Sequence, residues 1–164
     1  MKVIGLVLPA ELYDNEPGLD RTMVLAPDLL GSDVPLPVYR ARRQGEPAAA
    51  VITTIARQGY VGPIRLLVSI TADGRILAAR AIVHEETPGL GDRIDAAKSD
   101  WMNGFNGRSA SDPPTERWAV RRDGGDFDQL TGATVTSRAV VDAVRDALLY
   151  FQQHRDEIFR RPVE

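Results

Sequence analysis

Hydroxyl side chains gather in the stretch DQLTGATVTSRAVVDAV, which begins at Asp128. Four of them surround Gly132: Thr131, Thr134, Thr136 and Ser137. A helical pattern follows, and one hydroxyl can cap a helix by accepting a backbone N–H bond, so we expect Thr136 or Ser137 to be the cap. Gly132 lets the backbone approach a ligand, and a helix N-terminus offers free N–H donors to a phosphate. The stretch therefore predicts a capped helix that leaves Thr131 and Thr134 available for chemistry.

A second stretch, HEETPGLGDRI, covers residues 84–94. Pro88-Gly89 suits the centre of a type II turn, because proline presets φ and glycine accepts a positive φ. Gly91 removes another side chain nearby, which would bring bare backbone close to a neighbour. A tight connection between a strand and a helix explains the same residues, so both interpretations remain open.

His84 and Glu86 also permit a catalytic interpretation. Two residues apart on a strand, they would share a face and could serve as a base and its partner, with Thr134 as the nucleophile of a hydrolase. Solvated charge at a strand end is the simpler explanation. The chain has two histidines and no cysteine, so it has no His-rich metal site and no thiolate site, and we expect no metal. Any redox chemistry must come from a bound organic cofactor.

Length and composition fit one compact soluble domain of 164 residues. The net charge is only −3, which does not indicate a nucleic-acid partner or a polybasic membrane patch. The apolar run from Val3 to Leu8 is far shorter than the ~20 residues that cross a bilayer.

Strand patterns dominate the first half of the chain. Residues 38–56 predict two strands joined at residues 44–47. Residues 64–71 alternate apolar and other side chains, which predicts a half-buried strand. Asp73-Gly74 predicts a hairpin turn, followed by a returning strand over residues 75–84.

Helical spacing dominates the second half. Residues 91–105 carry apolar side chains at helical intervals, with Asp92 placed to cap that helix. Residues 117–122 predict a short strand, and residues 140–151 carry the apolar face of a long closing helix. The order predicts an α+β fold, an antiparallel sheet flanked by helices in a single domain. Prolines in residues 9–37 predict an irregular segment that wraps the domain.

The segment from Asp128 to Thr134 resembles the flavinylation motif of the FMN-binding domain, in which the threonine after Gly-Ala is joined to the FMN phosphate. With HEETPGLGDRI and the Gly59–Gly62 element, the resemblance extends over nearly the whole chain to the G subunit of the Rnf electron transport complex. The C subunit of the Na⁺-translocating NADH:quinone reductase shares the domain and the threonine motif and is a close alternative. HEETPGLGD and DGGDFDQLTGAT favour Rnf.

The resemblance implies a set of residues around FMN. Thr134 would be the covalent acceptor, and the phosphate pocket would be shaped by Thr131, Gly132 and Ala133, with Thr136 nearby. The isoalloxazine ring would pack against the turn Glu86, Thr87, Pro88, Gly89, Leu90 and Gly91. Tyr60 and Trp101 are further candidates for the ring environment, although the helical spacing of Trp101 equally predicts a core residue. Asp128 matches the acidic position read by the flavin transferase.

The resemblance also implies an organisation and a role. Residues 38–164 would be the FMN-binding domain, and residues 1–37 an irregular segment following a membrane anchor that the family carries and this chain lacks. The domain would face the periplasm at the inner membrane, with the other membrane subunits and the flavin transferase as partners. It would relay electrons within a complex that moves them between ferredoxin and NAD⁺ and couples this transfer to ion translocation. It would not be catalytic alone, and it would not bind NAD, since it has no Rossmann fingerprint. Made without the transferase, it would mostly lack FMN. A flavin-free assembly or sensory module remains an alternative.

Overall fold

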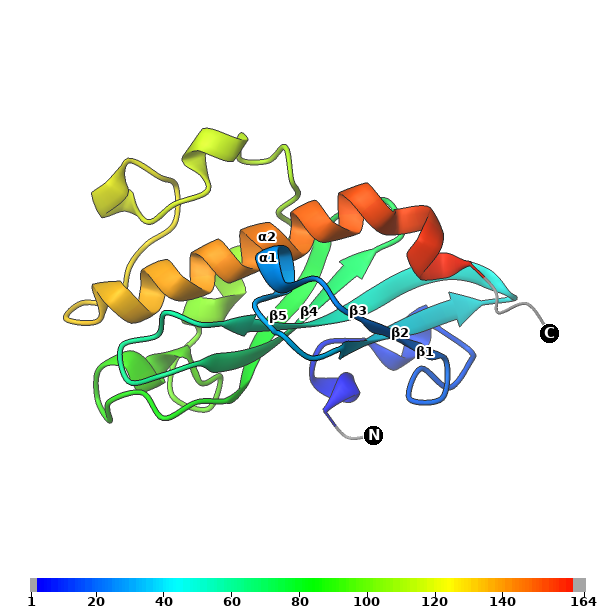
Figure 1. The fold of residues 1–164 in the computed structure, drawn as a ribbon, viewed down its shortest axis with the longest axis horizontal. Coiled ribbons are helices and arrows are strands. Elements are labelled where there is room, and N and C mark those ends of the chain that lie inside the picture. The colour runs from blue at the N-terminus through cyan, green and yellow to red at the C-terminus, as the bar shows by residue number, and fades with distance from the viewer. Residues whose placement is uncertain (1–2, 161–164) are drawn as a thin grey trace.

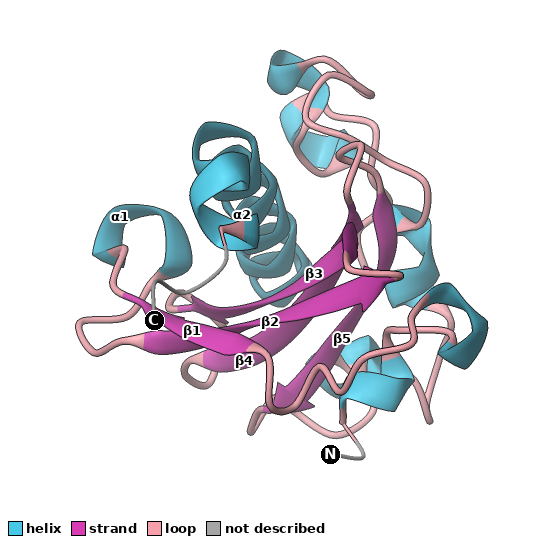
Figure 2. Cartoon of the chain, turned by 90° about the vertical axis from the view of Figure 1, so that its right-hand side faces the viewer, coloured by secondary structure: helices cyan, strands magenta, loops and turns pink. Residues whose placement is uncertain are grey.

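The computed structural model describes residues 3–160. One antiparallel sheet has the strand order β1-β2-β3-β4-β5. Its strands are β1 (Arg21–Val24), β2 (Leu36–Arg43), β3 (Glu46–Ala56), β4 (Ile64–Thr71) and β5 (Ile76–Val83). Two α-helices, α1 (Pro27–Leu30) and α2 (Thr134–Phe159), lie on one face of this sheet (Figures 1 and 2). The predicted α+β fold, an antiparallel sheet flanked by helices, is confirmed.

The hairpin turns lie where the sequence predicts them. Gln44 and Gly45 join β2 to β3 with positive φ angles of 52° and 80°, and Gly74 has a φ of 95° between β4 and β5. Glycine adopts this region at little cost, which is why these turns are readable from the sequence. β4 has the predicted bounds, whereas β5 is one residue shorter at each end than predicted.

The main core lies between α2 and the sheet. Val140, Val144 and Leu148 lie on one face of α2 and are at most 2% exposed. They belong to the same buried cluster as Leu66 and Val68 of β4. The apolar faces that the helical and strand periodicities predict therefore pack against each other in this core.

The opposite face of the sheet is covered as well. The N-terminal segment forms two 3₁₀ helices, Ile4–Leu6 and Ala10–Leu12, beneath the strands (Figure 2). Val7 and Leu8 pack with Leu67, and Ser69 Oγ donates a 2.7 Å hydrogen bond to the Val7 carbonyl. The predicted half-buried β4 is thus wrong, because this segment buries its second face too.

The segment expected to be irregular contributes regular structure. β1 pairs with β2 as the edge strand, and α1 packs beside α2 (Figure 2). α1 begins with Pro27 and ends at Gly31, whose φ is 72°. Pro at a helix start and Gly after its end are standard helix boundaries.

The predicted helix over residues 91–105 is wrong. Two 3₁₀ helices, Gly91–Ile94 and Trp101–Phe105, stand in its place. Between them, Asp95 Oδ1 accepts the Ala97 N–H at 3.0 Å and Ser99 Oγ accepts the Trp101 N–H at 3.2 Å. Such local side-chain bonds compete with the backbone hydrogen bonds of an α-helix, and in this segment they replace them.

The predicted strand over residues 117–122 is also wrong. Val120 makes only an isolated bridge with Phe127, between the 3₁₀ helices Thr115–Arg117 and Arg121–Asp123. A strand needs a partner along its length, and the described residues offer this segment only one bridging residue.

The C-terminal end of α2 is tied to β2. The helix bends at His154, where φ is −125°, and its last turn folds toward the sheet (Figure 1). Arg40 donates from Nε to the Ile158 carbonyl, and Arg42 donates from Nη2 to the Phe159 carbonyl at 2.9 Å. Both guanidinium groups also pair with Asp20, at 2.8 and 3.0 Å. Cations at a helix C-terminus satisfy its free carbonyls and its dipole. Within residues 3–160, no helix has the length and apolar character needed to span a membrane.

Candidate functional site

Helix α2 begins at Thr134, before the two residues predicted to cap it. Gly132, with a φ of 76°, turns the chain into the helix, and Ala133 is the N-cap residue without a side-chain cap. The predicted caps are wrong: Thr136 and Ser137 lie inside the first turn. A Cβ atom at Gly132 would lie 3.2 Å from Leu90 Cδ2, so glycine also allows the close approach of that side chain.

The hydroxyls of Thr136 and Ser137 have other partners, and both residues are buried. Thr136 Oγ1 donates a 2.6 Å hydrogen bond to Glu86 Oε1. Ser137 Oγ accepts the Leu130 N–H at 2.9 Å and donates to the Ala133 carbonyl at 2.8 Å. These bonds fix the segment before α2 and the HEETPGLGDRI stretch against the first helical turn.

The first turn of α2 has unused donors. The first bond into the helix runs from the Ser137 N–H to the Ala133 carbonyl at 3.1 Å. The N–H groups of Thr134, Val135 and Thr136 have no hydrogen-bond acceptor among residues 3–160, and neither does the Thr134 hydroxyl. Free N–H groups at the positive end of a helix dipole suit a phosphate.

The turn opposite Thr134 has the predicted geometry. Gly89 has a φ of 78°, and the Leu90 N–H donates to the Thr87 carbonyl at 3.0 Å, as in a type II turn. Asp92 Oδ1 accepts the Gly89 N–H at 2.9 Å. Asp92 therefore fixes this turn and does not cap the helix for which the sequence suggested it.

A cavity of about 480 Å³ separates the turn from the helix start. Eight residues of the expected FMN set line it: Tyr60, Thr87, Leu90, Gly91, Gly132, Ala133, Thr134 and Thr136. Val135 completes the lining. Tyr60, Leu90 and Val135 are 71%, 42% and 44% exposed, so apolar groups form the open rim while the polar donors lie at the helix start. A planar aromatic ligand with a phosphate fits this distribution.

The other expected residues lie outside this lining. Thr131, Pro88 and Gly89 are exposed beside the cavity, and Glu86 is buried behind its wall at 4% exposure. Trp101 lines a different cavity of about 520 Å³, where its indole Nε1 donates to the Asp128 carbonyl at 2.8 Å.

Arg93 is a cation beside the cavity that the sequence did not single out. Its Nε donates to the Leu90 carbonyl at 2.8 Å and its Nη2 donates to the Thr131 carbonyl, which joins the two sides of the cavity. It has no carboxylate partner among the described residues. Arg93 lies within HEETPGLGDRI, and its position after two glycines and an aspartate was the available signal.

The hydrolase geometry is not formed. His84 Nδ1 accepts the backbone N–H of Glu86 at 3.2 Å, and its Nε2 lies 4.0 Å from Asp95 Oδ2. The Glu86 carboxylate binds elsewhere, and neither residue hydrogen-bonds Thr134 within residues 3–160. Thr134 therefore lacks the adjacent base that a hydrolytic nucleophile requires.

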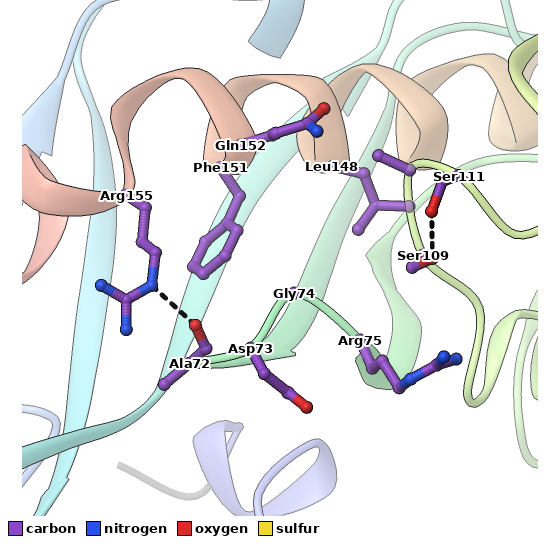
Figure 3. Close-up of a pocket in the computed structure, with 11 residues that line it drawn as sticks. Ala72, Asp73, Gly74, Arg75, Ser109, Ser111, Leu148, Phe151, Gln152 and Arg155 are labelled. Carbon is purple, nitrogen blue, oxygen red and sulfur yellow. Dashed lines mark hydrogen bonds between the residues drawn. The ribbon is translucent and has the colours of Figure 1, made fainter.

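Another cavity, of about 430 Å³, lies between the β4–β5 turn and the C-terminal half of α2 (Figure 3). Arg155 Nε donates to the Ala72 carbonyl at 2.7 Å, and Arg75 Nη1 donates to the Gly107 carbonyl at 2.8 Å. These arginine donors are used by carbonyls of the protein, whereas the backbone N–H groups of Thr134, Val135 and Thr136 have no acceptor among residues 3–160. The Thr134 cavity is therefore the candidate site.

Comparisons with known proteins show the family of this chain. Residues 59–149 match the FMN-binding domain model. The G subunit of the ion-translocating oxidoreductase complex from Pseudomonas aeruginosa is 51% identical over 152 residues, covering 93% of this chain and 71% of that protein. Its counterpart from Shewanella baltica is 45% identical over 163 residues, covering 99% and 77%.

Solved structures share the fold at lower identity. Shewanella oneidensis NqrC superposes with a TM-score of 0.61 at 20% identity, covering 92% of this chain and 77% of NqrC. The C subunit of the Na⁺-translocating NADH-quinone reductase from Parabacteroides distasonis gives 0.56 at 23%, covering 80% and 67%. The alternative drawn from that reductase thus shares the architecture, while sequence identity favours the ion-translocating oxidoreductase complex. The chain belongs to the FMN-binding domain family and, within it, to the G subunits of the ion-translocating oxidoreductase complex.

Proposed function

We propose that this domain carries FMN through a phosphoester to Thr134 Oγ1 and relays electrons as the G subunit of the Rnf complex. The observation that carries the proposal is the Thr134 hydroxyl, which lies in the cavity that the motif residues line. Neither it nor the three N–H groups around it has a partner among the described residues. When bound, FMN supplies one- and two-electron chemistry. The protein needs only to hold it and to shape its surroundings.

Each group of the site has a part in that task. The N–H groups of Thr134, Val135 and Thr136 bind phosphate oxygens, with the helix dipole behind them. Arg93 adds positive charge while it holds the Leu90 and Thr131 carbonyls. Leu90, Tyr60 and Val135 offer apolar surface to the ring and exclude water from one side of it. Arg93 and Trp101 both line the neighbouring 520 Å³ cavity, but Arg93 also bonds to the Leu90 and Thr131 carbonyls, whereas the Trp101 indole donates to the Asp128 carbonyl. We therefore leave Trp101 out of this set.

The attachment step is performed by a flavin transferase. The Thr134 hydroxyl oxygen would form a bond to the phosphorus of an activated flavin nucleotide as the P–O bond to its leaving group breaks, and a base would take the hydroxyl proton. No base hydrogen-bonds the Thr134 hydroxyl within residues 3–160, which is consistent with a base supplied by the transferase. The Asp128 side chain is 74% exposed although it pairs with Arg121 at 2.5 Å, so its carboxylate is accessible to the transferase.

The intact protein works at a membrane. Its relatives are subunits of an ion-translocating complex, and we propose that this domain lies on the periplasmic side of the inner membrane, beside the other subunits. Covalent attachment supports that placement, because a tethered FMN is not lost by dissociation in a compartment without a flavin supply. The 38–164 region would be the FMN-binding domain, with the preceding segment covering the sheet toward the membrane anchor.

Intact-mass spectrometry of protein co-produced with its native transferase tests the acceptor. We expect a gain of one FMN less water, yellow colour that survives denaturation and gel filtration, and neither in Thr134→Ala. Thr134→Ser keeps a hydroxyl and should still accept flavin. Thr115→Ala is the matched control, because Thr115 is exposed and lies outside both the cavity and the motif, and this variant should remain yellow. Covalent FMN in Thr134→Ala would assign the bond to another residue.

A further inference from the structure

Glu86 was expected to contact the flavin ring, but its surroundings give it a different task. Its side chain is buried, and among the described residues no cation forms an ion pair with it. Three hydrogen bonds compensate the carboxylate instead. The Tyr60 N–H donates to Oε1 at 2.8 Å, the Val61 N–H donates to Oε2 at 2.8 Å, and the Thr136 hydroxyl donates to Oε1 at 2.6 Å.

These bonds join three segments that are far apart in the sequence. Tyr60 and Val61 belong to the loop before β4, Glu86 precedes the type II turn, and Thr136 lies in the first turn of α2. All three segments line the Thr134 cavity, through Tyr60, Thr136 and Thr87, the residue next to Glu86. The Glu86 carboxylate does not line the cavity itself, but it hydrogen-bonds two of the residues that do, Tyr60 and Thr136.

The loop that holds Tyr60 is constrained on its own side as well. A Cβ atom at Gly59 would lie 2.2 Å from the Gly62 carbonyl oxygen, so the two ends of the loop lie close together. Tyr60 itself is 71% exposed and has little packing of its own to fix it. Its backbone is therefore placed by the hydrogen bond to Glu86.

We infer that Glu86 is a positioning residue that fixes the Tyr60–Val61 loop and so forms one wall of the cavity before a ligand binds. The inference rests on the proposed FMN site, but it assigns Glu86 no contact with FMN. A wall formed in advance saves the ligand the entropy of ordering it, which raises affinity. Glu86 thus acts on FMN through Tyr60.

Glu86→Gln tests this role with little change in volume. A glutamine has one acceptor oxygen and one NH₂ donor, so its NH₂ group must face the N–H of either Tyr60 or Val61. One backbone N–H then loses its acceptor. We expect faster hydrogen exchange at Tyr60 or Val61 in the FMN-free protein, and free-FMN affinity reduced about tenfold.

Glu85→Gln is the matched control, since it removes the same charge from the exposed neighbouring side chain. It should change neither measurement. In a Tyr60→Ala background, Glu86→Gln should weaken FMN binding by no more than about twofold, because residues that act through each other give non-additive effects. FMN affinity is read from the quenching of flavin fluorescence.

Three outcomes would overturn the inference: rapid exchange of the Tyr60 and Val61 amides in the wild-type protein without FMN, equal effects of Glu85→Gln and Glu86→Gln, or an undiminished effect of Glu86→Gln beside Tyr60→Ala. The exchange measurement on the wild type stands even if Glu86→Gln does not fold. None of these readouts depends on a covalent bond, so failure of Thr134 as the acceptor is distinguished by intact mass alone.

Discussion

Gly91 shows how close the turn and the helix start lie to each other. A Cβ atom there would lie 2.7 Å from Thr136 Oγ1 and 3.1 Å from Glu86 Cβ. Its φ is not in the left-handed region, so space and not backbone conformation requires glycine. The hydrogen bond between Thr136 and Glu86 can form only because this position has no side chain.

Gly91→Ala should therefore lower the free energy of unfolding by about 1–3 kcal/mol, the usual cost of overpacking a close contact. Urea denaturation measures the change. Gly104→Ala is the control, because a Cβ atom at Gly104 meets nothing within 4 Å and that residue has no positive φ. Equal destabilisation by both substitutions would show that the contact at Gly91 is not the cause.

The hydroxyls around Gly132 differ in whether they have hydrogen-bond partners. The sequence suggested a cap at Thr136 or Ser137, but the structure gives these side chains to Glu86 and to Leu130 and Ala133. Partners that lie far away in the sequence, such as Glu86, cannot be read from local spacing. The Thr134 hydroxyl has no hydrogen-bond partner within residues 3–160, and its role as the acceptor stays a prediction.

At the scale of elements, α2 carries two carboxylates whose burial matters. Burial raises the pKa of Asp146 above its usual value, against the opposing effect of Arg145 at 3.2 Å. Burial raises the pKa of Asp142 in the same way. A raised pKa means that the folded state holds the proton more tightly than the unfolded state. Stability contributed by the protonated form is therefore present below about pH 3.8 and is lost as the pH rises through the folded pKa.

Asp146→Asn should accordingly stabilise the protein at neutral pH, because it removes an ionised carboxylate whose burial is unfavourable. The gain should vanish below the unfolded pKa, where the wild-type carboxyl is protonated. Urea denaturation at neutral pH and at about pH 3 compares the two conditions. Asp156→Asn, at a side chain that is 94% exposed on the same helix, should show no such pH-dependent gain. A gain that persists at the acidic pH would exclude burial of the ionised group as its origin.

Elements with strong local signals were predictable from the sequence. β4 and the turns at Gly45 and Gly74 follow from alternation and from glycine. The apolar spacing of residues 140–151 predicted α2, but not its start at Thr134 or its extension to Phe159. The region 91–105 failed because Asp95 and Ser99 bind nearby backbone N–H groups, a competition that apolar spacing does not reveal.

At the scale of the whole molecule, the sheet is enclosed from both sides. Strand alternation predicted one buried face of β4, but Leu67 and Ser69 are buried on the other. Their cover comes from residues about sixty positions earlier, as the bond between Ser69 and Val7 shows. The sequence did not predict this cover, because the prolines of residues 9–37 indicated an irregular segment and not the short helices and the strand that form there.

Leu8→Asp tests the contribution of this cover. Leu8 is 3% exposed, so the substitution should lower the free energy of unfolding by about 3 kcal/mol or more and increase the binding of a dye such as ANS. Leu6→Asp, in the neighbouring 3₁₀ helix but 57% exposed, should change stability by no more than about 0.5 kcal/mol. If both variants unfold at the same urea concentration, the N-terminal cover does not stabilise the sheet.

The attachment of α2 at both ends has one more consequence. Glu86 and Leu130 hold its first turn, and Arg40 and Arg42 hold its last, across 26 residues or about 39 Å of helix. A fluorophore bonded to Thr134 would thus be attached to a helix that is held at both ends and cannot rotate independently of the sheet. Its polarised emission should decay with the rotational diffusion of the entire domain, and a fast additional decay would reveal motion of the chromophore about its own bond.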